Sequence, residues 1–261
     1  MIKAKKSLGQ NFLVDKNIIN KISNIIDIQN KTILEIGPGT GNLTSSLLQR
    51  NPKKFYVIEK DNSLSLILKK EFQEQIIIIN DDILDINEST LSKEPLIVFG
   101  NLPYNISTEI LCKWILNIKQ DPWFEYLILM FQKEVADRII SKFNTKNYGR
   151  LSILANWRLD IEKICDVKAN SFLPIPKVDS SVLFFRPKKR FLNLNDPKNL
   201  EKITRVFFMH RRKMIKKPYN QLFNGNNDII SKLKVNLNLR PQNLNFETYF
   251  NLTKEYEKLR S

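Results

Sequence analysis

Short apolar runs that alternate with stretches of helical spacing restrict this chain to a small set of folds. Runs of strand length are found at 31–36, 54–58, 76–79, 96–99, 126–131, 161–167 and 182–185. Stretches with apolar residues three and four positions apart occur at 14–28, 43–49, 63–72, 107–115 and 133–143. Strands that alternate with helices form βαβ units, so we predict an α/β fold with a mostly parallel sheet and helices on both faces.

The character of the sequence changes after Pro187. Residues 188–197 are basic and then polar, which is typical of a linker. Short helices are expected further on, at 200–210, 219–223, 228–233 and 246–258. The sequence therefore predicts an N-terminal arm and α/β domain over 1–187, a linker over 188–197 and a small all-α domain over 198–261.

The composition argues against several classes of protein. No apolar run approaches the roughly 18–20 residues of a membrane helix, and the basic N-terminus is not followed by a signal segment. The two cysteines, Cys112 and Cys165, lack metal-ligand spacing and fit a reduced, cytoplasmic protein. A single histidine, His210, argues against a histidine-based metal site or triad. The net charge of +15 favours a polyanionic partner such as nucleic acid.

A glycine-rich segment, Glu35 to Asn42, lies between a predicted strand and a predicted helix, where nucleotide-binding turns occur. Its spacing is Gly-x-Gly-x-Gly, and Asn42 stands where the dinucleotide fingerprint has its last glycine. Glycine lets the backbone approach a ligand closely. We therefore predict a cofactor without a pyrophosphate, whose amino acid and ribose parts lie over the turn. The alternative is a tight turn that serves packing alone.

Acidic residues follow the next two strands. Glu59 ends the second strand roughly 20 residues after Gly37, the position from which a carboxylate accepts hydrogen bonds from ribose hydroxyls. Asp81 and Asp82 follow the third strand, and either is placed to accept a hydrogen bond from the adenine amino group of a cofactor. The spacing does not choose between these two aspartates.

The fourth strand is followed by Asn101-Leu102-Pro103-Tyr104. The Asn101 side chain offers a carbonyl oxygen to an amine, Pro103 restricts the turn, and Tyr104 offers a flat face for stacking. Ligands collect at the carboxyl ends of strands in open α/β sheets. This segment is therefore a candidate for holding a planar base by its exocyclic amino group, although Asn and Pro are also common in ordinary turns.

Further motifs accompany the four strand ends. They are Leu8-Gly9-Gln10-Asn11-Phe12-Leu13, Gly100 to Ser107, Phe131-Gln132-Lys133-Glu134-Val135, Tyr148-Gly149-Arg150-Leu151-Ser152, Ser171 to Pro174, Pro176 to Ser180, Arg211-Arg212-Lys213 and Arg240-Pro241. The strand ends resemble those of class I S-adenosylmethionine-dependent methyltransferases with an Asn-Pro-Pro-Tyr type motif. With the further motifs, nearly the whole chain resembles the ribosomal RNA adenine dimethyltransferases of the KsgA type.

The resemblance implies a Rossmann-like class I methyltransferase domain with a small helical C-terminal domain that contacts RNA. It implies dimethylation of N6 on two adjacent adenosines near the 3′ end of small-subunit (16S) ribosomal RNA, during ribosome assembly. The implied cofactor is S-adenosyl-L-methionine, without a metal. The expected partner is small-subunit ribosomal RNA or the immature 30S subunit, and we expect a cytoplasmic monomer.

The resemblance also assigns residues. The implied cofactor contacts are Asn11, Leu13, Gly37, Glu59, Asp82 and Asn101. This assignment favours Asp82 over Asp81. The implied catalytic residues are Asn101, Leu102, Pro103, Tyr104 and Phe172. In the mechanism that we hypothesise, the Asn101 oxygen and the Leu102 carbonyl accept the N6 hydrogens. Tyr104 stacks on the base and Phe172 closes its other face.

Basic segments are candidate phosphate contacts: Lys3, Lys5 and Lys6, then residues 188–190, then residues 211–217. The neighbouring Phe207 and Phe208 favour core packing over base stacking. Pro218 departs from the family pattern, and we expect it to end a helix there.

Three other functions remain open from the sequence. One is an adenine methyltransferase of the same architecture that acts on large-subunit ribosomal RNA and confers antibiotic resistance. Another is a ribosome-assembly factor whose catalysis is not essential. The third is a DNA adenine methyltransferase, because an Asn-x-Pro-Tyr turn does not distinguish DNA from RNA.

Overall fold

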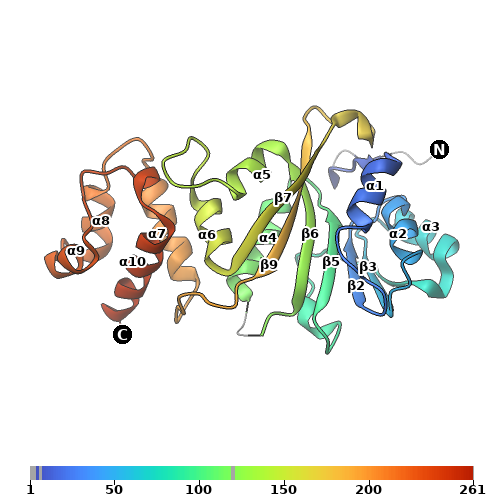
Figure 1. The fold of residues 1–261 in the computed structure, drawn as a ribbon, viewed down its shortest axis with the longest axis horizontal. Helices are drawn as coiled ribbons and strands as arrows, with labels where there is room; N and C mark the ends of the chain where they lie inside the picture. Colours follow the sequence, from blue (N-terminus) through green and yellow to red (C-terminus); the bar gives the residue numbers. More distant parts are fainter. Residues whose placement is uncertain (1–3, 6–7, 119–120, 261) are drawn as a thin grey trace. The chain divides into compact units, whose positions relative to one another are not determined.

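The computed structural model describes residues 4–5, 8–118 and 121–260, and the predicted phosphate contacts Lys3 and Lys6 lie outside them (Figure 1). The chain divides into two compact units. The first contains residues 1–113, 118–136 and 161–187, and the second contains residues 114–117, 137–160 and 188–261. The domain boundaries expected from the sequence stay a prediction.

A seven-stranded sheet forms the centre of the first unit, in the order β4-β3-β2-β5-β6-β9-β7. Its strands are β2 (Thr32–Ile36), β3 (Lys54–Ile58), β4 (Ile77–Ile79), β5 (Leu96–Asn101), β6 (Phe124–Gln132), β7 (Leu159–Val167) and β9 (Ser180–Pro187). Neighbours from β4 to β6 are parallel, whereas β9 pairs antiparallel with β6, beside which it lies in Figure 1. The mostly parallel sheet that the sequence predicted is therefore confirmed.

The two central strands are buried on both faces, as expected for strands covered by helices. Every residue of β2 is buried, and β5 is buried from Leu96 to Gly100. The chain runs from β2 outward to β3 and β4 and then returns to β5 on the other side of β2. This reversal of strand order is the place where open α/β sheets bind ligands, outside the carboxyl ends of their strands.

Helices α1 (Lys16–Ser23), α2 (Asn42–Leu48), α3 (Asn62–Phe72), α4 (Ser107–Asn117), α5 (Lys133–Ile139) and α6 (Arg150–Arg158) alternate with these strands. Asp15 caps α1, since its carboxylate accepts hydrogen bonds from the backbone of Asn17 and Ile18. Gly41, with φ +80°, is the N-cap of α2, and Asn42 is its first helical residue.

The N-terminal segment is joined to a segment far away in the sequence. Strand β1 (Phe12–Leu13) pairs antiparallel with β8 (Phe172–Leu173), with Phe12 opposite Leu173 and Leu13 opposite Phe172. The backbone amide of Val14 donates to the Ser171 carbonyl at 2.9 Å. The Ser171 hydroxyl in turn donates to the Asp15 carboxylate at 2.9 Å. These bonds fix residues 12–15 beside the sheet.

The C-terminal part of the second unit is all-α, with α7 (Lys198–Phe208), α8 (Lys216–Phe223), α9 (Asn227–Leu233) and α10 (Phe246–Lys258). Phe207 is fully buried and packs edge-on against Tyr249, so its predicted core role is confirmed. Pro218 does not end a helix, which corrects the expectation: it lies in the first turn of α8, where backbone N–H groups lack helical acceptors anyway. Within the described residues no helix has the length and apolar character needed to span a membrane.

Candidate active site

A cavity lies at the carboxyl ends of β2 to β5, within the first unit. It is lined by residues from the N-terminal segment, the glycine turn and the ends of three further strands: 8–13, 35–40, 42–43, 58–60, 64, 81–83 and 101–106. The sheet reversal between β2 and β5 brings these segments together, because Ile36 pairs with Gly100 at the ends of the two strands. The cavity therefore contains every predicted cofactor contact, and four of the five predicted catalytic residues.

The glycine turn forms the floor of this cavity in a conformation that other residues rarely adopt. Gly39 has φ +58°, and a Cβ built on it would lie 2.6 Å from the Phe12 ring. Gly37 has φ +64°, and its Cβ would lie 3.6 Å from the Asn101 carbonyl oxygen. Because Gly39 has no side chain, Phe12 can pack over the turn. Because Gly37 has none, the space between Gly37 and Asn101 stays open.

Glu59 presents a buried carboxylate beside the glycine turn. Its Oε2 accepts the Gly39 N–H at 3.3 Å, and its Oε1 accepts the Asp61 N–H at 2.9 Å. Burial raises the pKa of Glu59, and these backbone hydrogen bonds partly oppose that shift. Two backbone N–H groups therefore fix the orientation of the carboxylate, whose contact with ribose hydroxyls stays a prediction.

The two aspartates after β4 both line the cavity but differ in their contacts. The Asp82 carboxylate forms an ion pair with Lys60, whose hydrogen bond lowers the pKa of Asp82 below its ordinary value. Asp81 is exposed, and its carboxylate accepts the Asp82 N–H at 2.8 Å. Asp82 is the better fixed of the two, although the geometry does not assign the cofactor contact to either one.

Asn101 ends β5 with its side-chain amide turned toward the N-terminal segment. Its Nδ2 donates to the Asn11 backbone carbonyl at 2.9 Å. Because this bond uses the NH₂ group, it distinguishes the two ends of the amide. The side-chain oxygen accepts no hydrogen bond from the described residues, and so it is available to a ligand amine.

The rest of the turn after β5 is anchored by side chains. Leu102 is buried, and Tyr104 is half-buried with its hydroxyl 2.6 Å from that of Ser180. Burial raises the pKa of Tyr104, so its hydroxyl stays protonated at neutral pH. Tyr104 and Pro103 both line the cavity, as a platform for a base requires.

Phe172 is placed differently from the other predicted residues. It is 2% exposed, packs in the core of the first unit and is absent from the cavity lining. Side chains alternate along β8, so the adjacent Leu173 points outward and is 61% exposed. The structure places Phe172 opposite the predicted cofactor contact Leu13 but outside the cavity lining, and its role against the base stays a prediction.

Three polar residues of the site escaped the sequence reasoning. The Asn42 side chain donates to the Leu13 carbonyl at 2.8 Å and holds the N-terminal segment. Glu35 accepts the Thr44 hydroxyl at 2.6 Å, and burial raises the pKa of Glu35 to about 8. Asp61 is buried two residues after Glu59. The sequence did hold a signal for Glu35 and Asp61, because each acid lies two residues from a predicted cofactor contact, Gly37 or Glu59.

No group of three or more His, Cys, Asp or Glu side chains that could hold a metal ion occurs among the residues that the structure describes. The cavity instead combines a glycine turn, carboxylates after β3 and β4 and an amide after β5. Fold and site together define a class I methyltransferase. The chain matches the model of the ribosomal RNA adenine dimethylase family over residues 1–258, and it belongs to that family.

Individual relatives agree with this assignment. The chain is 62% identical to the ribosomal RNA small subunit methyltransferase A of Pelagibacter ubique, over 99% of both chains. It is 44% identical to the protein of the same name from Ehrlichia ruminantium, over 95% of both chains. Among solved structures, a dimethyladenosine transferase from Plasmodium falciparum superposes with a TM-score of 0.79 at 27% identity, covering 95% of this chain and 98% of that one. The 23S rRNA methyltransferase ErmE shares the fold, with a TM-score of 0.69 at 23% identity, covering 96% of this chain and all of the other.

Proposed function

We propose that this protein uses S-adenosylmethionine to dimethylate N6 of two adjacent adenosines near the 3′ end of small-subunit ribosomal RNA. The observation that carries the proposal is the orientation of Asn101, whose amide nitrogen is bound to Asn11 and which lines the same cavity as the glycine turn. The relatives named above, at 62% and 44% identity, are small-subunit methyltransferases, which supports this substrate.

The residues of the cavity fit the cofactor. The open space over Gly37 leaves room for close approach, and the buried Glu59 carboxylate suits ribose hydroxyls. Asp82 suits an adenine amino group, and the buried Ile83 beside it suits the apolar face of a purine. Asn11 and Leu13 close the cavity from the N-terminal side. S-adenosylmethionine supplies an activated methyl group on its sulfonium when bound.

The turn after β5 then prepares the acceptor nitrogen. An adenine amino group is a poor nucleophile because its lone pair is delocalised into the ring. Two acceptors, the Asn101 oxygen and the Leu102 carbonyl, bind its hydrogens and hold the nitrogen pyramidal, while Tyr104 stacks on the base. Alignment of this kind supplies most of the rate gain without a strong base. The target base has to leave its stack, so unpaired RNA is the natural substrate.

The basic segment after α7 is the part of the second unit that we assign to phosphate contacts. Arg211 has a structural role, because its guanidinium binds the Gln242 side chain at 3.2 Å and the Lys146 carbonyl. Arg212 and Lys213 are exposed, and so are Lys216 and Lys217. We infer that these four side chains contact the RNA backbone of an immature 30S subunit, and that the protein acts as a monomer in the cytoplasm.

Transfer of a labelled methyl group tests the function. We expect incorporation into unmethylated small subunits, with dimethyladenosine at two adjacent positions near the 3′ end of the RNA. Naked RNA, large subunits and duplex DNA are the comparison substrates. Preferential labelling of large subunits or DNA would contradict the proposal, and so would small-subunit binding without S-adenosylmethionine binding or transfer.

A further inference from the structure

We propose that Asp61 is a positioning residue for this reaction: it fastens the N-terminal strap, defined as Lys5 and residues 8–13, across the cofactor cavity and thereby sets the orientation of the Asn101 amide. The proposal deepens the methyltransferase function proposed above and rests on it. Neither Asp61 nor Lys5 lines the cavity, so both would act through the residues that they bind.

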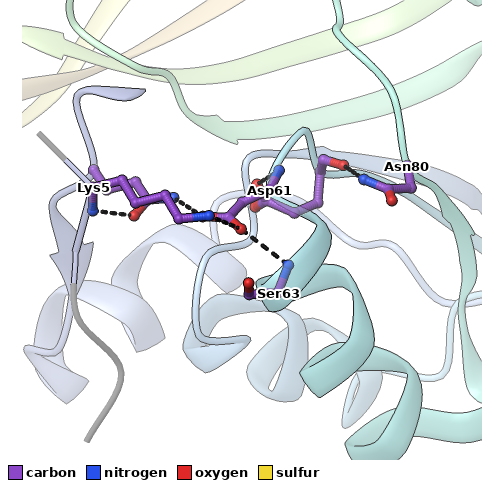
Figure 2. Close-up of polar contacts among 6 residues, drawn as sticks. Lys5, Asp61, Ser63 and Asn80 are labelled. Atoms are coloured by element: carbon purple, nitrogen blue, oxygen red, sulfur yellow. Dashed lines mark hydrogen bonds and ion pairs between the residues drawn. The ribbon is translucent and has the colours of Figure 1, made fainter. Parts of the chain in front are cut away.

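The Asp61 carboxylate is buried, and most of its partners come from the strap (Figure 2). Its side chain is 3% exposed, its Oδ1 accepts Lys5 Nζ at 2.7 Å, and its Oδ2 accepts Gln10 Nε2 at 2.9 Å. The remaining bond comes from the Ser63 N–H at 3.0 Å, at the start of α3. A buried carboxylate without such partners is strongly unfavourable, so the strap and Asp61 stabilise each other.

The strap presents its two donors as one unit. The Lys5 N–H donates to Gln10 Oε1 at 2.6 Å, and the Lys5 carbonyl accepts the backbone N–H of Leu8 at 3.1 Å. Gln10 is therefore bonded through its side-chain oxygen to Lys5 and through its side-chain nitrogen to Asp61. Burial alone would raise the pKa of Asp61, but the bonds from Lys5, Gln10 and Ser63 outweigh it and lower the pKa.

The other end of the strap reaches the turn after β5. The Asn11 carbonyl accepts the Asn101 amide at 2.9 Å. Gly9 has φ +63°, and a Cβ on it would lie 3.0 Å from the Asn105 side-chain oxygen, so the strap passes close to this turn. Residues 8–13 line the cavity between these two anchor points.

Asp61 thus connects three functional parts. Its backbone N–H binds the Glu59 carboxylate at 2.9 Å, its side chain binds the strap, and the strap orients Asn101. Release of the strap from Asp61 would open one wall of the cofactor cavity and free the Asn101 amide to rotate. Both cofactor affinity and methyl-transfer rate should fall, which a purely structural ion pair would not cause.

Variants of the strap test this without disturbing the cap of α3. Gln10→Glu is nearly isosteric and places a second carboxylate against Asp61, while Lys5→Met removes the cation and Lys5→Arg keeps it. Lys31→Met is the matched control, because Lys31 is 48% exposed, similar to 50% for Lys5, and also forms an ion pair, with Glu125. Lys31 does not line the cavity.

We expect Gln10→Glu to raise the Kd for S-adenosylmethionine about tenfold, equivalent to about 1.4 kcal/mol, and to lower kcat on small subunits by a similar factor. Amide hydrogen exchange at residues 8–13 should accelerate in the cofactor-free protein. Lys5→Met should show the same changes more weakly, and Lys5→Arg and Lys31→Met should behave as wild type.

The proposal is overturned if Gln10→Glu and Lys5→Met keep Kd, kcat and exchange rates within twofold of wild type while the wild-type protein methylates small subunits. It is also overturned if Lys31→Met produces the same losses. If the wild-type protein transfers no methyl group, the proposed function is wrong. Amide hydrogen exchange at residues 8–13 would still show whether Asp61 holds the strap. If Gln10→Glu fails to fold, the comparison of Lys5→Met with Lys5→Arg decides.

Discussion

The hydroxyl oxygens of Tyr104 and Ser180 lie 2.6 Å apart, and their hydrogen bond joins the turn after β5 to the first residue of β9. Ser180 is fully buried and pairs with Gln132 on β6. The sheet therefore fixes the position of a ring that lines the cavity. The hydrogen bond therefore helps to orient the ring, and we propose that the ring face is the part of Tyr104 that contacts the base.

Tyr104→Phe should separate these two roles. Loss of the buried hydrogen bond should lower the free energy of unfolding by about 0.5–1.5 kcal/mol, but the ring remains and methyl transfer should fall only a few-fold. Tyr104→Ala should lose the stacking and reduce kcat by at least tenfold. Denaturant unfolding and methyl-transfer kinetics measure the two effects. Equal activity losses in both variants would show that the hydroxyl has a role in the chemistry.

Asn101→Ala should remove the acceptor for the target amine. We expect ribosomal RNA binding to remain and kcat to fall by at least a hundredfold, since one well-placed polar group in an active site commonly contributes that much. Filter binding and labelled-methyl transfer on the same preparation measure the two quantities. Near-normal turnover would rule out the assigned role of Asn101.

Gly39→Ala should impair cofactor binding through the strap. The new methyl group would lie 2.6 Å from the Phe12 ring at a backbone angle of φ +58°, and the left-handed conformation alone costs about 1–2 kcal/mol. Gly149→Ala is a suitable control, because Gly149 has extended backbone and the nearest atom to its Cβ is 4.0 Å away. Calorimetric titration should show weaker S-adenosylmethionine binding only in Gly39→Ala. Identical titration curves for both variants would contradict the packing argument.

Glu35 should make the stability of the protein depend on pH. Burial raises the pKa of Glu35 from 4.5 to about 8, so the folded state holds the proton more tightly than the unfolded state does. The stabilisation is complete below pH 4.5 and is lost as the pH rises through 8. Glu35→Gln keeps an acceptor for the Thr44 hydroxyl and should flatten this decline in chemical denaturation between pH 5 and 8. If stability still declines with the same slope in Glu35→Gln, other groups such as Glu59 cause the decline.

Arg212 and Lys213 should contribute to RNA affinity through charge alone. The double variant Arg212→Gln/Lys213→Gln should bind small subunits more weakly and show a smaller slope of log K against log salt. Arg211→Gln should instead lower the thermal midpoint, because Arg211 binds the Lys146 carbonyl and Gln242. If the salt dependence of binding is unchanged in the double variant, Arg212 and Lys213 do not contact the RNA.

Local patterns were sufficient to predict most of the fold. β3 spans 54–58 in both the prediction and the structure, and α10 spans 246–258 in both. Helix ends were less predictable, because they depend on capping. The apolar spacing suggested a helix over 14–28, yet α1 ends at Ser23, and Ile25 and Ile26 pack against the core outside it. Pro218 was misjudged because proline disfavours only the interior of a helix, and the sequence did not show where α8 begins.

The positions of Glu59 and Asn101 beside the cavity were predictable, because each residue lies at the end of one strand. The contacts between separate segments of the chain were not predictable. The bond from Asn101 to Asn11 and the bond from Asp61 to Lys5 join residues that are distant in the chain, and no spacing rule specifies them. The sequence likewise did not show which of Phe172 and Leu173 turns into the core, because the pairing of β8 with β1 decides this.

The pairing of β1 with β8 also has a consequence for synthesis. Phe12 and Leu13 leave the ribosome long before their β partner, Phe172–Leu173, which is among the last parts of the first unit to be made. A contact between segments so far apart in the chain forms slowly and late. A growing chain that lacks the second segment should therefore not retain S-adenosylmethionine, so this enzyme acquires its donor only when its catalytic unit is nearly finished.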